Sequence, residues 1–130
     1  MACNIKKDRQ KSRELLNELE SIVEEDDLVT RQFILRSRAL LGSEEGACSP
    51  EETLEMLLEA IRLTVPKFDL EEINRGLYSL EEVKVINQIA GIYSNNGQNR
   101  KATNILGQLL KYVKKHNQNL QQSAGMFPFP

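Results

Sequence analysis

The stretch 83-VKVINQIAGIYSNNGQNRKATNILGQLLKYVKKH-116 decides the fold of this 130-residue chain. Its apolar residues recur three or four positions apart, which is the spacing of one helix face, both before and after 95-NNG-97. Asparagine and glycine are residue types that tight turns use. The stretch therefore predicts two antiparallel helices, over residues 80–94 and 99–116, joined by a short turn.

Six residues of this stretch occupy the positions that mark a tetratricopeptide repeat of 34 residues. They are Ile86, Ala90, Tyr93, Gly97, Ala102 and Leu106. The two alanines let antiparallel helices approach closely, the glycine supplies the turn, and the tyrosine fills the groove between successive hairpins. The pattern thus resembles one tetratricopeptide repeat over residues 83–116.

Helical periodicity extends over almost the whole chain, and no stretch alternates with a period of two. Further helices are expected over residues 8–25, 28–41 (ended by Gly42), 50–64 and, as a short one, 69–76. Three capping boxes are expected: Ser49 with Glu52, Asp69 with Glu72, and Ser79 with Glu82. In the last helix the residues expected inside are Ala102, Ile105, Leu106, Leu109, Leu110 and Val113. The fold class is therefore all-α, with antiparallel hairpins stacked as a short tetratricopeptide-like solenoid.

Three parts of the chain follow from this pattern. Residues 1–12 are expected to be a linker or a disordered N-terminus, and residues 13–116 the tetratricopeptide-like domain. Residues 117–130, rich in Gln and Asn and ending in Phe-Pro-Phe-Pro, are expected to be a tail or the start of a truncated further helix.

Beyond the repeat, the chain resembles the C-terminal repeat region of bacterial helix-turn-helix transcriptional regulators of the peptide-responsive type. The segments that carry the resemblance are 31-RQFIL-35, 49-SPEE-52, 57-LLEA-60, 66-PKFDL-70 and 86-INQIA-90. In that family, a DNA-binding domain precedes a tetratricopeptide-like array that dimerises and senses a ligand. The resemblance implies a sensor or dimerisation domain that binds a protein or short peptide. It implies no direct DNA binding by this chain, which has no helix-turn-helix domain.

Four residues are expected to project into the concave groove of the repeat when Val83 is counted as its first position: Lys84, Asn87, Gly91 and Ser94. An amide offers both a donor and an acceptor, which suits the backbone of an extended peptide. Asn87 is the central candidate. The alternative is a solvated helix face without a ligand.

Charge divides unevenly along the chain. Residues 1–82 hold 11 basic and 19 acidic residues, whereas residues 83–130 hold six basic and no acidic ones. The six are Lys84, Arg100, Lys101, Lys111, Lys114 and Lys115. They form either a patch for nucleic acid or, as we prefer, a solvated face whose last lysines complement a helix dipole.

No arrangement of side chains in the sequence has the spacing of a catalytic or metal site, so neither an enzyme nor a cofactor is expected. Cys3 and Cys48 are interpreted as free thiols, and His116 as a solvent-exposed helix-end residue. Apolar runs are too short for a membrane span, and no secretory signal is apparent, which favours the cytoplasm. The leading hypothesis is a regulatory binding domain that also forms a homodimer; the alternatives are a stand-alone tetratricopeptide adaptor and a small nucleic-acid-binding protein.

Overall fold

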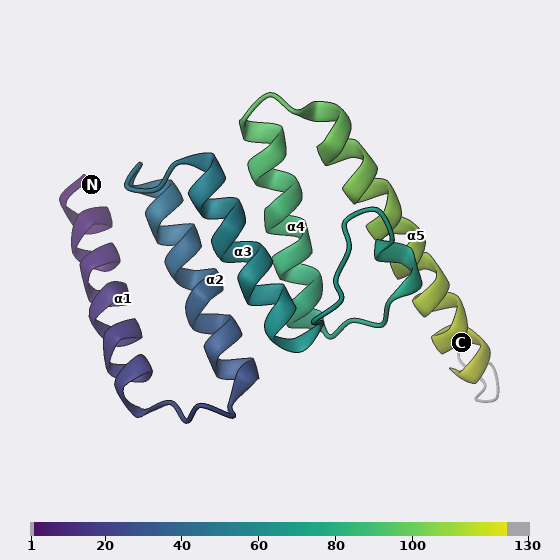
Figure 1. Cartoon of the computed structure of the whole chain (residues 1–130), viewed down its shortest axis with the longest axis horizontal. Helices are drawn as coiled ribbons and strands as arrows, with labels where there is room; N and C mark the ends of the chain where they lie inside the picture. The colour runs from purple at the N-terminus through teal and green to yellow at the C-terminus, as the bar shows by residue number, and fades with distance from the viewer. Residues whose placement is uncertain (1, 125–130) are drawn as a thin grey trace. The chain divides into compact units, whose positions relative to one another are not determined.

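The computed structural model describes the backbone of residues 2–124 and the side chains of residues 8–116. All regular structure in residues 2–124 is helical, so the predicted all-α class is confirmed. In chain order the helices are α1 (Ala2–Ile22), α2 (Leu28–Glu44), α3 (Pro50–Thr64), the short 3-10 helix η1 (Ile73–Arg75), α4 (Leu80–Asn95) and α5 (Asn99–Ala124) (Figure 1). They form two compact units that divide between Lys67 and Phe68.

In the first unit, α2 packs against both α1 and α3. The N-cap of α2 is Asp27, whose carboxylate accepts hydrogen bonds from the Thr30 hydroxyl at 2.6 Å and the Thr30 amide at 3.1 Å. Both bonds lower the pKa of Asp27, and the bond from the Thr30 hydroxyl has the larger effect. At the start of α3, Ser49 and Glu52 form the predicted capping box. The two interhelical turns of this unit are thus built by short-range side-chain contacts.

A buried glutamine joins α2 to α3. The Nε2 of Gln32, a residue only 2% exposed, donates to the Ala60 carbonyl at 2.9 Å and to the Thr64 hydroxyl at 2.8 Å. Around it, Ile34 and Ala39 of α2 are buried. Because a buried amide without partners is costly, these bonds favour one alignment of the two helices.

Three helix boundaries in the first unit differ from the prediction. The first helix begins at Ala2, so residues expected to be a linker are helical, and it ends at Ile22. No Gly or Pro occurs before Gly42 to interrupt it. The next helix runs past Gly42 to Glu44, and Gly46, with φ 71°, takes the left-handed conformation instead. Gly42 serves packing, because a Cβ there would overlap the Sγ of Cys48.

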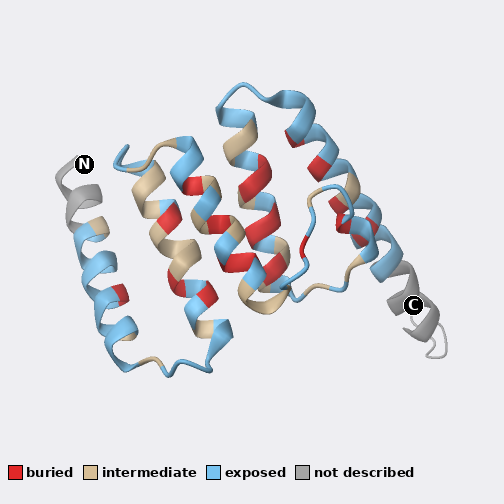
Figure 2. Ribbon diagram, in the orientation of Figure 1, coloured by how far each residue is buried: buried red, intermediate tan, exposed pale blue. Residues whose placement is uncertain are grey.

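In the second unit, α4 and α5 form the predicted helical hairpin. Ser79 and Glu82 form the capping box that starts α4, and Gly97 makes the turn with φ 79°. Figure 2 shows the buried positions along both helices. They are Glu82, Val85, Ile86, Ile89 and Ala90 of α4 and Ala102, Ile105, Leu109 and Tyr112 of α5.

The buried face of α5 agrees with the expected one in part, since Ala102, Ile105 and Leu109 are buried as predicted and three other residues are not. Leu106, Leu110 and Val113 are exposed, by 45%, 54% and 37%. Tyr112 is buried in their place. The reason is that the connection between α3 and α4 packs on α5 through η1, which selects the face carrying Tyr112. The helix also continues beyond His116 to Ala124, over residues expected to be a tail; residues 125–130 lie outside the described residues.

The short helix predicted over residues 69–76 forms only in its last part: it stops at Gly76 as expected, but it does not start at Asp69. The Oδ1 of Asp69 accepts a hydrogen bond from the amide of Glu71 at 2.9 Å, which makes a turn rather than a capping box with Glu72. Only the three residues of η1 are helical in this segment. The amide of Ile73 is bonded to a side chain of α5 rather than to its own segment, so tertiary contact has replaced local helix.

Candidate functional site

All four residues predicted to line a groove lie on the solvent side of α4. Lys84, Asn87, Gly91 and Ser94 are exposed, and their spacing of three, four and three positions places them in one row along the helix. Ile86 and Ile89, on the opposite side, are fully buried. The sequence therefore identified a row of surface residues on a helix whose other face is anchored in a core.

The row combines three kinds of surface. The Nζ of Lys84 lies 3.3 Å from the Oε1 of Glu81, so its charge is partly balanced within the helix. No hydrogen bond joins the Asn87 side chain to another described residue, which leaves its donor and acceptor facing solvent. Nothing lies within 4 Å of a Cβ built at Gly91. Chemically, the row could accept a polar backbone at Asn87 and an acidic group at Lys84.

The residues of the repeat pattern are distributed between core and surface. Ile86, Ala90 and Ala102 are buried, and Gly97 is in the turn. Tyr93 is half-buried, with the Nζ of Lys101 5.4 Å from its ring centroid, in the range of a cation–π contact. Leu106 is exposed rather than inside. Tyr93 and Lys101 also line a small hollow of about 110 Å³ together with Leu70, Glu71, Asn104 and Ile105.

A second group of polar side chains lies on α5 and was missed by the sequence. Gln108 uses both ends of its amide: Oε1 accepts from the Ile73 amide at 3.0 Å, and Nε2 donates to the Leu70 carbonyl at 2.7 Å. One turn later, the Tyr112 hydroxyl bonds to both the amide and the carbonyl of Tyr78. All four partners are backbone atoms of the segment that precedes α4. We call residues 68–78 the strap.

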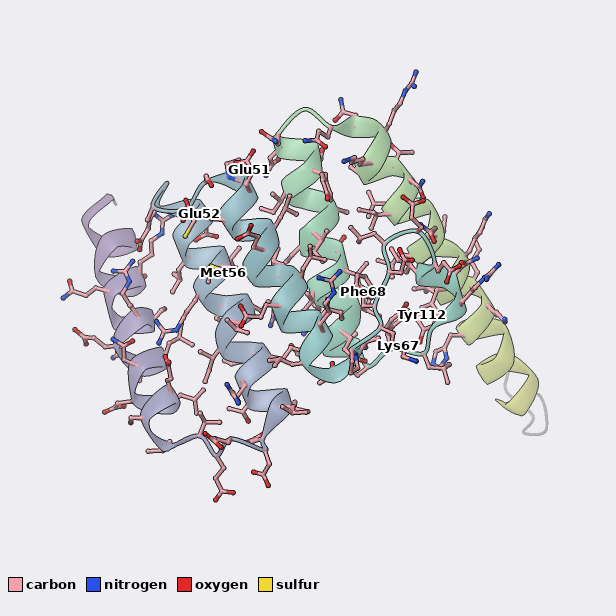
Figure 3. All side chains as sticks on the ribbon, in the orientation of Figure 1. Glu51, Glu52, Met56, Lys67, Phe68 and Tyr112 are labelled. Atoms are coloured by element: carbon pink, nitrogen blue, oxygen red, sulfur yellow. The ribbon has the colours of Figure 1, made fainter. Side chains whose placement is uncertain are left out.

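Aromatic rings continue this contact along α5. Phe68 and Tyr112, labelled in Figure 3, each meet Tyr78 edge-on, with ring centroids 6.2 Å and 5.1 Å from that of Tyr78. His116 stacks on Tyr112 with centroids 6.1 Å apart. Burial first, and then the nearby Tyr112 and Glu82, raise the pKa of Tyr78 above its ordinary value. The ring of Tyr78 is thus held as a neutral phenol between two aromatic neighbours.

The larger hollows of the first unit are ionic in character. One, of about 320 Å³, has Val23, Ile34 and Leu35 at its floor and a rim of charged residues. On that rim Arg31 donates to the Glu25 carbonyl at 3.1 Å, and Arg38 pairs with Glu20. These contacts hold α1 and the loop after it against α2, and we assign them to the fold.

The described residues were also compared with the requirements of a metal site and of a membrane-spanning helix. No three His, Cys, Asp or Glu side chains within residues 8–116 come together as a metal site would require. No helix in the described part of the chain is long and apolar enough to cross a membrane.

Comparisons of the chain with protein-family models, with curated proteins and with solved structures gave no match.

Proposed function

We propose that this chain is a protein- or peptide-binding regulatory domain, the sensor and dimerisation part of a bacterial transcriptional regulator acting in the cytoplasm. The fold underlying the proposal is a short tetratricopeptide-like solenoid. In its support, α4 packs against α5, the alanines Ala90 and Ala102 are buried at 1% and 4% exposed, and the chain turns at Gly97. Small residues at such a crossing are typical of helical repeats.

A single observation carries the binding part of this proposal. The row Lys84, Asn87, Gly91, Ser94 is exposed over residues 84–94 of a helix whose other side is buried. It offers an amide, a hydroxyl, a cation and an open space at Gly91. Such a surface suits an extended peptide, whose backbone needs donors and acceptors in a row. The regulatory step would be a shift of population toward the conformation that the peptide prefers.

Asn87→Ala tests this assignment. The variant should keep its fold, because the side chain is exposed, yet retain fewer peptides from a random displayed library than wild type does. Loss of one hydrogen-bonding partner at an interface weakens binding by about 1–3 kcal/mol. Thr103→Ala, an exposed polar residue of α5, is the matched control. Equal retention by Asn87→Ala and wild type would remove the α4 row from the proposal.

The homodimer is proposed on a different surface. The exposed side chains of Leu106, Leu110 and Val113 share one face of α5 at helical spacing. Lys111 and Lys114 flank them, while the α1 region of a second copy offers seven acids between Glu14 and Asp27 and no base. Sedimentation equilibrium should show that wild type forms dimers and that Leu110→Lys weakens them. The control Leu77→Lys, which changes another exposed leucine, should leave the dimers intact. Monomers of wild type at high concentration would refute it.

Experiments can distinguish the two alternative functions, a stand-alone adaptor and a nucleic-acid-binding protein, from the proposed one. A stand-alone adaptor would bind peptides through the same row, but no DNA-binding domain would be encoded before Met1 in its gene. A nucleic-acid-binding protein would use the cations of α5, so it would shift duplex DNA in a gel, and the shift would weaken steeply with salt. Absence of such a shift at low salt rules out the nucleic-acid function.

A further inference from the structure

The strap is held on α5 without any hydrogen bond from helix backbone to strap backbone. Its backbone–backbone bonds are local, from Glu72 to Asp69 and from Arg75 and Gly76 to Glu72 and Ile73. Its attachment to α5 includes the four bonds made by Gln108 and Tyr112, the packing of η1 on α5 and the contact of the Tyr78 ring with Tyr112. Three of its side chains, which we call the anchors, are buried or half-buried: Phe68, Ile73 and Tyr78. Side chains that bond main-chain atoms recognise a peptide whatever its own side chains are.

The anchors supply the specificity that backbone contacts lack. Phe68 is 5% exposed and Ile73 fully buried, while Tyr78 lies between two aromatic rings. They follow one another at intervals of five residues. Between them most residues are exposed and polar, as at Glu72 and Asn74, while Leu70 is half-buried and Leu77 exposed. The strap thus presents an aromatic, an aliphatic and a tyrosine side chain at this spacing: Ile73 lies in η1, which packs on α5, Tyr78 meets Tyr112, and Phe68 supports the Tyr78 ring.

The end of the strap is shaped for Tyr78. Gly76 has an extended backbone with φ −89°, and a Cβ at this position would overlap the phenol of Tyr78. That phenol donates a hydrogen bond to the Ile73 carbonyl at 2.7 Å. Beyond it, Leu77 is 87% exposed. Tyr78 is consequently the anchor that joins the strap's own fold to the Tyr112 hydroxyl.

We propose that the α5 face formed by Gln108 and Tyr112 is a peptide-binding site that the strap occupies in cis, and that a peptide with the same three anchors displaces it. This inference rests on the proposed function, since it names a second peptide contact of the same domain. The strap lies within the connection from Thr64 at the end of α3 to Leu80 at the start of α4. Its release would lengthen the tether between the two compact units, which converts peptide binding into a change that an attached domain can sense.

Competition in cis predicts two opposite effects of mutation. The tethered strap has a high effective concentration, so the site is open in only a small fraction of wild-type molecules. The apparent affinity of a free peptide is its intrinsic affinity multiplied by that fraction. Tyr78→Ala weakens the competitor and leaves the site intact. Tyr112→Phe removes two bonds to the backbone, from the strap in cis and from a bound peptide alike. In the Tyr78→Ala variant, whose strap is already weakened, this loss falls mainly on the bound peptide. The same peptide should therefore bind Tyr78→Ala more tightly than wild type. It should bind the double variant Tyr78→Ala, Tyr112→Phe less tightly than Tyr78→Ala.

The probe is a labelled synthetic peptide with the sequence of residues 67–79, KFDLEEINRGLYS, titrated with the full chain by fluorescence anisotropy. We expect Tyr78→Ala to bind it about tenfold more tightly than wild type, since that is the effect of one lost anchor on the cis competitor. Adding Tyr112→Phe to that variant should reverse most of the gain. A scrambled peptide is the control. No binding by the folded Tyr78→Ala variant overturns the proposal.

Hydrogen exchange of wild type gives a second readout that needs no variant. The amides of Ile73 and Tyr78 should exchange faster than those of Ile86 and Ile89, and added peptide should accelerate the strap amides only. Strap amides as slow as those of α4, or unchanged by the peptide, contradict an exchangeable strap. A third outcome is that library peptides bind, that their binding depends on Asn87, and that the strap peptide does not compete with them. In that case this inference fails and the proposed function stands. If neither kind of peptide binds, both fail.

Discussion

The hydroxyl of Tyr112 bonds both polar backbone atoms of Tyr78, accepting from its amide at 3.0 Å and donating to its carbonyl at 3.1 Å. The two residues are 34 positions apart, and their rings also meet edge-on. One side chain of α5 thus holds the residue that immediately precedes the capping box of α4. The contact joins the strap, the start of α4 and the middle of α5, and it explains why Tyr112, rather than its apolar neighbours, faces inward.

Tyr112→Phe should lower the free energy of unfolding. The ring and its contacts with Tyr78 stay, but the amide and carbonyl of Tyr78 lose their partner, which costs about 1–3 kcal/mol. Urea denaturation followed by circular dichroism measures the loss. Tyr93→Phe is the control, because no hydrogen bond joins the Tyr93 hydroxyl to another described residue. Equal loss in both variants would contradict the role given to the Tyr112 hydroxyl.

Gly76→Ala and Gly91→Ala should act in opposite directions. At Gly76 the new Cβ overlaps the phenol of Tyr78, so the strap must shift and the protein is destabilised. At Gly91 the Cβ meets nothing within 4 Å inside a helix, so alanine should add about 0.5–1 kcal/mol of stability. The melting temperature of each variant, compared with that of wild type, measures these opposite changes in stability. A neutral Gly76→Ala would mean that the Tyr78 ring is not confined.

Ala102→Leu should destabilise the α4–α5 hairpin. Ala102 is 4% exposed, and a larger side chain must push the helices apart, at a cost of about 1–3 kcal/mol. Leu106→Ala, at a position 45% exposed, removes comparable volume from the surface and should cost much less. Thermal unfolding of the two variants gives the comparison. An Ala102→Leu protein as stable as wild type would refute the close approach at this residue.

Alkaline pH should destabilise the protein through Tyr78. Its pKa is raised above 10.0, chiefly by burial, so the folded state holds the phenol proton more tightly than the unfolded state does. The resulting stability is fully present below pH 10.0 and is lost as pH rises through the folded-state pKa. Unfolding free energies measured across this range should fall less steeply for Tyr78→Phe than for wild type. Parallel slopes for the two proteins would exclude this role of Tyr78.

Several features of the fold could be predicted from the sequence because they depend on residues close together in the chain. The capping boxes at Ser49 and Ser79 need only a residue three positions later, and both form. The turn at Gly97 needs only its own φ. The exposure of the α4 row followed from helical periodicity, since the buried isoleucines of the same helix fix its orientation. Whether that row binds a ligand stays a prediction.

Tertiary structure alone decided the strap and the buried face of α5. Asp69 and Glu72 have the spacing of a capping box, yet Gln108, 35 positions after Ile73, takes the Ile73 amide and prevents a longer helix. Along α5, apolar residues occur on two faces, and periodicity cannot rank Leu106 and Leu110 against Ile105 and Leu109. The choice depends on what packs against the helix, and here the strap selects the face with a hydroxyl and an amide that can satisfy its backbone. Hydrogen-bonding needs of a non-helical segment are met by distant residues, so they leave no local signature in the sequence.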